Sequence, residues 1–382
     1  MAKNFNISLA LGVNERFDHR ILLGIIKYAQ SRENWRLFGN EWLFQAQKGH
    51  RVPKPDGIIA RIKNRDDLRR LKSYQVPVVD IAGSYDDDRL YRAVNNDRLT
   101  GFLAGKHLMG CGLSNFAFVG LTDVLWSMDR MYGLQDATRE TKGDEVPFFS
   151  ADVSWLNKDV DVTPLSRWLR KLPLPCGVLA ANDLFGYKVS VAAAMVGLRI
   201  PEQLALIGVD NEELFCELAQ PPLSSVSCDC EKIGREAADL LNSVLRDEDP
   251  LRQVIVPPQG IIQRESSNIV IGEDELVRDI KRYIRANAMS GINVNDVAAA
   301  FPLSRRALEK RFQKHGGTTI HEEILATRIE KSRHLLETGK NGIEAGLGSG
   351  FSSVQHFYYT FKKHVGITPI EYAEKVKREK NS

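Results

Sequence analysis

Two stretches near the end of the chain carry side chains of the kinds that contact nucleic acids. In residues 303–323 and 352–372, apolar residues recur at helical spacing and leave polar and basic residues on the opposite face. Arginine and lysine donate hydrogen bonds to guanine, glutamine pairs with adenine, and tyrosine reaches phosphate or a thymine methyl group. For one stretch alone, the solvated face of a helical bundle is an equal alternative, but two in tandem favour DNA. The outward-facing candidates are Arg305, Arg306, Glu309, Lys310 and Gln313 in the first stretch, and Gln355, Tyr358, Tyr359, Lys362 and Lys363 in the second.

The two stretches are copies of one unit, because their matching residues keep a single register. At a constant offset of 49 residues, Ser304 matches Ser353 and Phe312 matches Phe361. Such a sustained register indicates a repeated supersecondary unit. The further matches are Leu308 with Phe357, Lys314 with Lys363, His315 with His364, Gly317 with Gly366, Thr319 with Thr368, and Glu322 with Glu371.

Each unit is predicted to fold as a helix, a tight turn and a second helix. The predicted N-caps are Asn293 or Asn295 and then Ser304 in the first unit, and Ser352 or Ser353 and then Thr368 in the second. Pro369 would stand at the first position of the last helix, where its missing N–H is not needed. The predicted inward faces are Ala307, Leu308, Arg311 (through its stem) and Phe312, then Val354, Phe357, Phe361 and Val365.

These residues, with the pattern GF-SS-x7-FKK-x2-G-x-TP-x-EY that begins at Gly350, resemble the AraC-type DNA-binding domain over about 110 residues. The resemblance implies two helix-turn-helix units joined by a long helix, here at 322–337. It also implies recognition helices that enter the major groove roughly one turn, ~34 Å, apart. The implied base-facing residues are Arg306, Glu309, Lys310, Val354, Gln355, Tyr358 and Tyr359, and Arg305, Ser353 and Lys362 complete the predicted DNA-contacting set.

One segment departs from that family's pattern. Before the second recognition helix the family usually reads I-x-E-I-A-x-x-x-G-F, whereas this chain reads GIEAGLGSGF at 342–351. Each interior glycine weakens a helix by ~1 kcal/mol relative to alanine. We therefore expect a frayed helix here and weaker docking of the second unit on DNA.

The first 270 residues alternate short apolar runs with amphipathic stretches. The runs are NISLALGV, DGIIARI, VPVVDIA, FAFVGL, CGVLAA and LALIGVD. Alternation of this kind predicts parallel sheets covered by helices. The motifs G-x-G-x-x-G after the first strand and G-x4-G-K-[ST] are both missing, which disfavours dinucleotide and triphosphate binding.

Landmarks along these residues resemble the effector domain of LacI-type repressors, which shares its bilobed fold with periplasmic sugar-binding proteins. They are PDGIIA (55–60), VPVVDIAG (76–83), VNNDRLTGFLAGKHLMGCG (94–112), AANDLFGYKVSVAAAMVGLRIPEQLALIGVDNEE (180–213) and PPLSSVS (221–227). The resemblance implies an α/β bilobed sensor at 1–270, ahead of an all-α domain at 271–382. LacI-type repressors carry their DNA-binding domain before this module, so here the order is reversed.

A sugar cleft needs paired hydrogen-bond donors and acceptors for hydroxyl groups and a flat apolar partner for the ring. Arg130, Asn182 and Asp210 match positions that commonly contact sugars in LacI relatives. The alternative for each is a structural turn, because Asn and Asp after a strand often cap the next helix. The full set of predicted ligand-binding residues is Asp18, Arg61, Tyr85, Trp126, Arg130, Asn182, Asp183 and Asp210.

A sensor of this type ahead of an AraC-type domain is similar to the xylose operon regulators of bacteria. The segments that carry this resemblance are FDHRILLGIIKYA (17–29), GSYDD (83–87), GVDNEEL (208–214) and VPPQGIIQRESSN (256–268). The resemblance implies a transcription factor that responds to xylose or a related pentose, most simply an activator. Its implied partners are promoter DNA, a second copy of the chain in a homodimer, and RNA polymerase. A regulator of a different sugar or sugar derivative remains the alternative.

The composition fits this reading. From Glu273 to Ser382 there are 19 Lys and Arg against 14 Asp and Glu, which suits a polyanion partner. No apolar run reaches the ~20 residues that span a membrane, and the first residues read poorly as a signal peptide, so we expect a cytoplasmic protein. A sugar-binding protein for transport would need export, and it would not need the C-terminal repeat.

No catalytic or cofactor motif stands out. G-x-S-x-G is missing, and the eight histidines show no metal-ligand spacing, so we expect neither an enzyme nor a metal or cofactor site. Cys228 and Cys230 are one residue apart, which matches neither a zinc C-x2-C pair nor a redox C-x-x-C pair. We expect all five cysteines to be ordinary reduced thiols.

Overall fold

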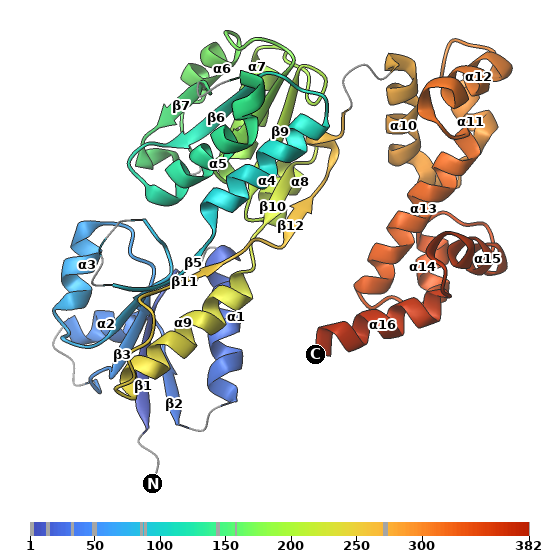
Figure 1. Ribbon diagram of the computed structural model, residues 1–382. Helices are drawn as coiled ribbons and strands as arrows, with labels where there is room; N and C mark the ends of the chain where they lie inside the picture. Colours follow the sequence, from blue (N-terminus) through green and yellow to red (C-terminus); the bar gives the residue numbers. More distant parts are fainter. Residues whose placement is uncertain are drawn as a thin grey trace. The chain divides into compact units, whose positions relative to one another are not determined.

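The computed structural model describes residues 4–12, 16–31, 34–47, 52–84, 87, 90–142, 146–156, 159–269 and 274–381. The chain divides into two compact units, residues 1–271 and 272–382 (Figure 1). Tyr85, one of the predicted ligand-binding residues, lies outside the described residues.

The first unit contains two six-stranded sheets, each at the centre of one lobe. The first sheet has the order β11 (Gln253–Val256), β5 (Tyr91–Asn95), β4 (Val78–Asp80), β3 (Gly57–Ala60), β1 (Phe5–Ala10) and β2 (Trp35–Phe38). The second has the order β12 (Gly260–Ile262), β10 (Ser224–Ser227), β9 (Leu204–Val209), β8 (Cys176–Ala180), β6 (Phe116–Leu121) and β7 (Phe148–Ala151). The pairings are parallel except for that of β10 with β12.

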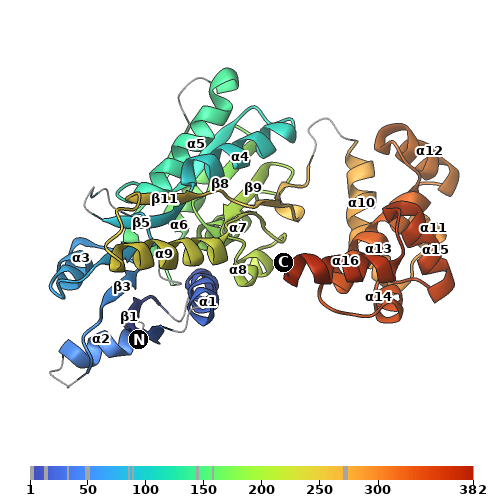
Figure 2. The same ribbon diagram turned by 60° about the horizontal axis from the view of Figure 1, so that its bottom comes forward.

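Helices flank both sheets, as Figures 1 and 2 show. Those of the first lobe are α1 (Arg16–Gln30), α2 (Asn40–Gln47), α3 (Arg65–Lys72) and α9 (Cys230–Leu245). Those of the second lobe are α4 (Asp97–Gly110), α5 (Leu125–Lys142), α6 (Thr163–Leu169), α7 (Asp183–Met195) and α8 (Glu213–Leu218), with the 3-10 turns η1 (Val153–Leu156) and η2 (Glu265–Ser267). The chain therefore passes between the lobes after β5, after β10 and after β11.

The predicted strands are confirmed as β1, β3, β4, β6, β8 and β9. They lie inside their sheets, and β6 and β9 are buried at every position, as a strand covered on both faces requires. The strands β2, β5, β7, β10, β11 and β12 were not predicted from the sequence.

All five cysteines are buried and in the reduced thiol form, as expected. Burial raises the pKa of Cys230 to about 12 and that of Cys228 well above its ordinary value, so both thiols stay protonated at neutral pH. Within the described residues, no helix is long and apolar enough to cross a bilayer.

The second unit is all helical, and a long helix joins its two halves (Figure 1). Its elements are α10 (Glu275–Asn287), η3 (Ala288–Ser290), α11 (Val294–Ala299), α12 (Arg305–Gly316), α13 (Ile320–Glu337), α14 (Gly342–Gly348), α15 (Val354–Val365) and α16 (Pro369–Asn381). The long helix predicted at 322–337 is α13, which begins two residues earlier with a capping box of Thr319 and Glu322.

The predicted caps of the repeat are confirmed, and the structure chooses between the alternatives. Asn293 caps α11, Ser304 caps α12 and Ser353 caps α15. The hydroxyl of Thr368 accepts a hydrogen bond from the Glu371 N–H at 3.3 Å, which caps α16.

Two apolar cores hold the unit together, and equivalent residues of the repeat occupy them. Leu308 and Phe312 are fully buried in one core, and Phe357 and Phe361 in the other. The prediction was wrong for Ala307 and Arg311, which are exposed. Helical spacing put Arg311 beside the core, but its guanidinium instead donates to Asp274 at 2.8 Å, at the start of α10. Val354 and Val365 are half-buried.

The buried side chain of Arg328 on α13 joins the two cores. Its guanidinium donates to the carbonyl of Ala288 at 3.0 Å and to that of Ile292 at 2.8 Å, both in the first half. The same guanidinium lies 5.9 Å from the ring centroid of Phe351 in the second half. Its hydrogen bonds satisfy the buried charge, so α13 fixes the two halves against each other.

The glycine-rich segment forms α14, capped by Asn341 and Glu344, in place of the frayed helix that the sequence suggested. The glycines allow α15 to approach closely. A Cβ on Gly346 would lie 2.7 Å from the ring of Phe357, and one on Gly342 would lie 2.3 Å from the Tyr358 hydroxyl. Gly350 has φ +85°, and a Cβ there would lie 2.4 Å from the Ala288 carbonyl oxygen. Close packing thus compensates for low helix propensity.

We predict that Gly346→Ala destabilises the second unit although alanine favours helices. Helix propensity would add ~1 kcal/mol, but overpacking against the buried Phe357 ring removes ~1–3 kcal/mol, so a net loss of about 1 kcal/mol, and at most about 2 kcal/mol, is expected. Urea unfolding of the full chain, followed by hydrogen exchange at the α14 and α15 amides, measures it. The control is Gly348→Ala, whose Cβ would meet only the flexible end of Leu335 at 3.2 Å and should be neutral or slightly stabilising. Equal stabilisation by both changes would contradict the close-packing account.

Candidate functional site

The predicted ligand-binding residues follow the carboxyl ends of strands in both lobes, where ligands of parallel sheets bind. Asp18 lies in the first turn of α1, beyond β1, and Arg61 directly follows β3. Trp126 and Arg130 lie on α5, beyond β6. Asn182 and Asp183 follow β8, and Asp210 directly follows β9.

In the first lobe, Asp18 and Arg61 form a pair. The fully buried Asp18 carboxylate accepts a hydrogen bond from Arg61 Nη1 at 2.9 Å and another from the Gly12 N–H at 2.9 Å. The Arg61 guanidinium also lies 5.1 Å from the ring centroid of Phe17. The Arg61 side chain is 22% exposed, so the pair presents a held cation beside the ends of β1 and β3.

In the second lobe, Arg130 is the centre of a buried charged cluster. Its Nε donates to Asp97 Oδ1 at 2.8 Å, its Nη1 to the Ala181 carbonyl at 2.6 Å, and its Nη2 to Asp210 Oδ1 at 3.4 Å. Burial alone would lower the pKa of Arg130, yet the carboxylates of Asp97 and Asp210 raise it, so the guanidinium keeps its charge. The indole of Trp126 covers it, with the guanidinium 4.9 Å from the ring centroid.

Asp210 is held at one carboxylate oxygen by two donors. Its Oδ1 accepts from Arg130 and from the thiol of Cys228, whose Sγ lies at 3.6 Å. Its backbone has φ +98°, a left-handed conformation that a non-glycine residue adopts only when its surroundings impose it. The sequence did not identify Asp97 or Cys228 as part of this cluster. Asp97 does lie inside the landmark 94–112, but an acidic residue in the first turn of a helix is common and does not by itself indicate a charged cluster.

Asn182 and Asp183 make structural contacts, which the sequence had left open as the alternative to ligand contact. The Asn182 side chain caps α7 by accepting from the Phe185 N–H at 3.0 Å. The buried Asp183 carboxylate accepts from Ser225 Oγ and from the Glu212 N–H, each at 2.7 Å. Burial, aided by the nearby charge of Asp210, raises the pKa of Asp183 well above its ordinary value. Asp183 therefore fixes the loop after β9 against α7.

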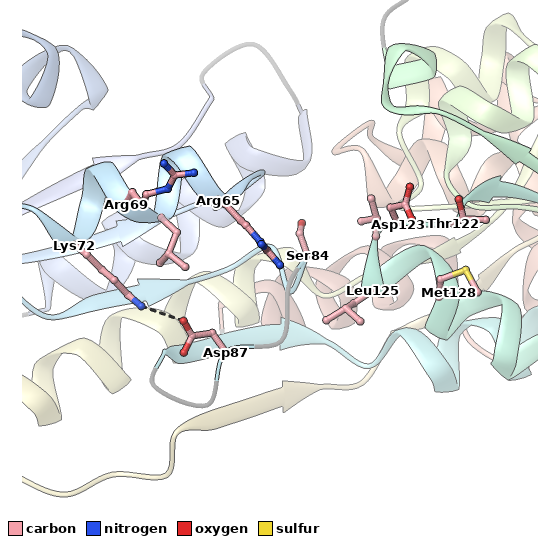
Figure 3. A pocket seen from close by; sticks show the side chains of 11 residues that line it. Arg65, Arg69, Lys72, Ser84, Asp87, Thr122, Asp123, Leu125 and Met128 are labelled. Carbon is pink, nitrogen blue, oxygen red and sulfur yellow. Dashed lines mark hydrogen bonds and ion pairs between the residues drawn. The ribbon is translucent and has the colours of Figure 1, made fainter.

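A cleft of about 770 Å³ opens between the lobes. Figure 3 shows Arg65, Arg69 and Lys72 of α3 on one side, and Thr122, Asp123, Leu125 and Met128 on the other. The Leu125 N–H donates to the Ser84 carbonyl at 3.3 Å across the cleft, and Lys72 pairs with Asp87 at 3.0 Å. Among the described residues that line this cleft are none of the predicted ligand-binding residues, although Leu125 and Met128 flank Trp126. Nothing in the sequence distinguished the basic residues of α3 from those of any exposed charged helix.

In the second unit, the basic residues of α12 are exposed to solvent, and Arg305 among them has side-chain hydrogen bonds. Arg305 donates to Asn295 Oδ1 at 2.6 Å and to Glu309 Oε1 at 3.1 Å, so its guanidinium has a fixed orientation. Arg306 and Lys310 are exposed. Lys310 also lines a groove of about 460 Å³ beside the start of α10, together with Lys314 and His315.

The outward face of α15 is less charged. Gln355 and Lys362 are exposed, and Tyr359 is 71% exposed, which is unusual for a large aromatic side chain. Tyr358 is half-buried against α14, and Val354 is half-buried. Ser353 uses its hydroxyl to cap the helix, accepting from the His356 N–H at 3.2 Å.

Comparison with known proteins supports both units. A family model described as a XylR N-terminal domain matches residues 6–97, one described as a periplasmic binding protein-like domain matches 106–267, and one described as a helix-turn-helix domain matches 297–375. The xylose operon regulatory protein of Escherichia coli K12 is 33% identical over 97% of this chain and 97% of its own length. That of Haemophilus influenzae is 30% identical over 96% of this chain and 98% of its own.

Solved structures agree with these matches. One described as the xylose-binding transcription activator xylR superposes with a TM-score of 0.74 at 31% identity, covering 98% of both chains. A LacI family regulator from Enterococcus faecium with bound ribose covers 70% of this chain and 99% of its own, with a TM-score of 0.56 at 20% identity. This second likeness concerns the fold alone. The comparisons confirm the bilobed sensor, the AraC-type domain and the prediction of a transcription regulator that is not an enzyme.

We predict that Arg130→Met strongly destabilises the first unit. Losing the guanidinium leaves the Asp97 and Asp210 carboxylates without a shared counter-charge in a site where Arg130 is only 5% exposed, so a loss of about 3–5 kcal/mol is expected. The control Arg98→Met breaks an exposed pair with Asp136 and should change stability by less than about 1 kcal/mol. Urea unfolding of the full chain measures both.

The loss of stability caused by Arg130→Met should also depend on pH. Burial raises the pKa of Asp97, and Arg130 opposes that shift, so removing Arg130 raises the pKa further. A raised carboxyl pKa means that the folded state binds a proton that the unfolded state releases, so stability grows as pH falls toward the unfolded value near ~4. We expect the deficit to be largest at about pH 8 and smaller at about pH 5. A deficit of equal size at both would show that Asp97 does not carry the penalty.

Proposed function

The chain belongs to the family of the xylose operon regulatory proteins, and we propose that it is a sugar-dependent activator of transcription. In this proposal the first unit binds xylose or a related pentose, and the second binds promoter DNA through α12 and α15. The observation that carries it is the combination, in one chain, of a bilobed sensor with a cleft between its lobes and a tandem helix-turn-helix unit with two exposed polar faces.

The polar groups around the strand ends suit a small polyol. Arg61 and Arg130 supply fixed donors, and Asp210 supplies an acceptor, since only one of its carboxylate oxygens is held by Arg130 and Cys228. Trp126 supplies a flat apolar surface of the kind that packs on a sugar ring. We therefore assign ligand contact to these residues first, and a supporting role to Asp18, Asn182 and Asp183.

The two exposed faces of the second unit suit successive contacts along one side of a DNA duplex. On α12 we assign Arg306 and Lys310 to base edges or phosphate, and the held Arg305 with Glu309 to a fixed contact. On α15 we assign base contact to Gln355 and Tyr359, and phosphate contact to Lys362. Ser353, Val354 and Tyr358 shape the start and inner edge of that helix.

Sugar binding would shift the lobes between two arrangements of different affinity for the sugar. We propose that the regulator works as a homodimer, so that this shift changes how paired DNA-binding units meet their half-sites and RNA polymerase. Promoter DNA as the partner implies work in the cytoplasm. A footprint on DNA that does not depend on sugar would contradict the coupling.

One observation favours a second candidate effector. The wall of the cleft formed by α3 carries Arg65, Arg69 and Lys72, and cations of this kind would suit a phosphorylated or acidic sugar. Lys72 is already paired with Asp87 and Arg69 with Asp66, which makes a neutral pentose the first choice.

We predict that xylose raises the melting temperature of the purified chain. A ligand at ~100 times its dissociation constant stabilises the native state by ~2.7 kcal/mol. The panel includes other pentoses, hexoses and sugar phosphates at the same concentrations. A shift with a different sugar alone would replace the effector, and a shift with sugar phosphates alone would favour the charged wall of the cleft.

We predict that Lys310→Ala weakens binding to DNA selected by the wild-type chain from a random pool. Loss of one phosphate contact should lower affinity about 5- to 10-fold at low salt and reduce the slope of log K against log[salt] by about 0.9. The matched control is Lys331→Ala, which removes another exposed lysine, this one on α13. Equal loss from both variants, measured by fluorescence anisotropy, would show only a general effect of net charge.

A further inference from the structure

Asp210 belongs to a two-residue turn whose second residue contacts a different part of the lobe. Asp210 has φ +98° and Asn211 has φ +50°, so both are left-handed directly after β9. Asp210 meets Arg130, whereas the Asn211 side chain accepts a hydrogen bond from Arg264 Nη2 at 2.9 Å. The Asn211 N–H separately donates to Ser225 Oγ at 3.0 Å. Such a turn has few alternative conformations, so a displacement of Asp210 is passed to Asn211.

Arg264 is held on several sides. Its Nη1 donates to the Leu223 carbonyl at 2.9 Å, and its Nε lies 3.3 Å from Glu217 Oε1. Its backbone N–H donates to Ser224 Oγ at 2.8 Å. The Arg264 side chain is 17% exposed, whereas that of Glu217 is 60% exposed, so the bonds to Asn211 and Leu223 are the sheltered ones.

Arg264 also begins the segment that leads to the second unit. It directly precedes η2, whose serines are buried: Ser266 Oγ donates to the Leu206 carbonyl at 2.6 Å, and Ser267 Oγ to Ser224 Oγ at 2.8 Å. The first unit ends at residue 271, four residues after Ser267. Arg264 therefore contacts the turn that carries Asp210 through its side chain, and is continuous with the segment leading to the DNA-binding unit.

We propose that Arg264 is a positioning residue that transmits sugar binding at Asp210, through Asn211, to the segment that joins the DNA-binding unit. The inference rests on the proposed function and extends it to a named contact. A sugar hydroxyl that donates to the Asp210 carboxylate oxygen not bonded to Arg130 draws the carboxylate toward the ligand and moves the turn. The Asn211 amide then moves against Arg264, and the backbone that follows Arg264 moves with it.

Two substitutions at Asn211 isolate this contact. Asn211→Gly deletes the acceptor, and glycine tolerates φ +50° without strain. Asn211→Asp keeps an acceptor oxygen at the same place, and aspartate also tolerates the left-handed conformation. The Asn211 N–H bond to Ser225 is available in both. The pair therefore differs in the side-chain contact with Arg264 and preserves the turn.

The measurement is the affinity of the full chain for DNA selected by the wild-type chain, with and without saturating xylose. The ratio of the two dissociation constants is the coupling factor, and such factors are typically about 5- to 150-fold. We expect Asn211→Gly to reduce the wild-type factor at least about fivefold, or to abolish it, and Asn211→Asp to keep it within about twofold. Glu217→Gln, which removes only the exposed ion pair of Arg264, should also keep it.

Calorimetric titration of xylose, with and without DNA, gives an independent readout, because the effect of each ligand on the other is reciprocal. We expect Asn211→Gly to change the affinity for xylose in the absence of DNA by less than about threefold while losing this reciprocal effect. Full coupling in Asn211→Gly, or a loss confined to xylose affinity, would overturn the assignment of Arg264 while leaving the proposed function intact. A wild-type chain whose DNA affinity ignores every sugar that stabilises it would overturn the proposed function, and this inference with it.

Discussion

The burial of the Arg130 guanidinium between Asp97 and Asp210 is the constraint on which the candidate site of the first unit depends. A buried cation must be paired, so α5, the chain crossing after β5 and the turn after β9 have to meet at one point. The Ala181 carbonyl adds the end of β8 to the same point. Two carboxylates share one guanidinium there, which leaves an excess of acceptors. Hydroxyl groups of a sugar can donate to such acceptors without bringing a charge that would need its own partner.

The sequence predicted the centre of each sheet better than its remaining strands. The predicted strands are apolar and lie inside their sheets, where the pattern is a continuous run. The missed strands β2, β7, β11 and β12 are edge strands, short and partly exposed, so their residues need not be uniformly apolar. The buried strand β10 was missed for another reason. Its serines are satisfied by side-chain and backbone partners distant in sequence, such as Ser266 and Asp183, and no local pattern shows this.

The sequence predicted that the candidate residues follow strand ends, but not how they pair. Parallel strands bring such ends to one edge of each sheet. Which of them share a hydrogen bond depends on contacts across 33 positions for Asp97 with Arg130 and 80 for Arg130 with Asp210. The basic residues of α3 were beyond prediction, since an exposed charged helix reads the same whether or not a cleft lies beside it. Arg311 shows the same limit on a helix. Helical spacing placed it beside the core, but its hydrogen bond to Asp274, 37 positions away in sequence, sets the orientation of its side chain.

The two halves of the DNA-binding unit share a fold but not a way of holding their outward residues. In the first half, the side chains of Asn295 and Glu309 fix Arg305, so part of the face is ordered before any partner arrives. In the second half, the glycines of α14 admit the rings of α15 so closely that Phe357 and Tyr358 turn inward, which leaves Gln355 and the exposed Tyr359 outside. Glycines that weaken α14 as an isolated helix therefore determine which α15 side chains face solvent. Helix propensity alone predicts that these glycines only weaken the second half, because it describes the stability of one isolated helix and not how closely the next helix packs on it.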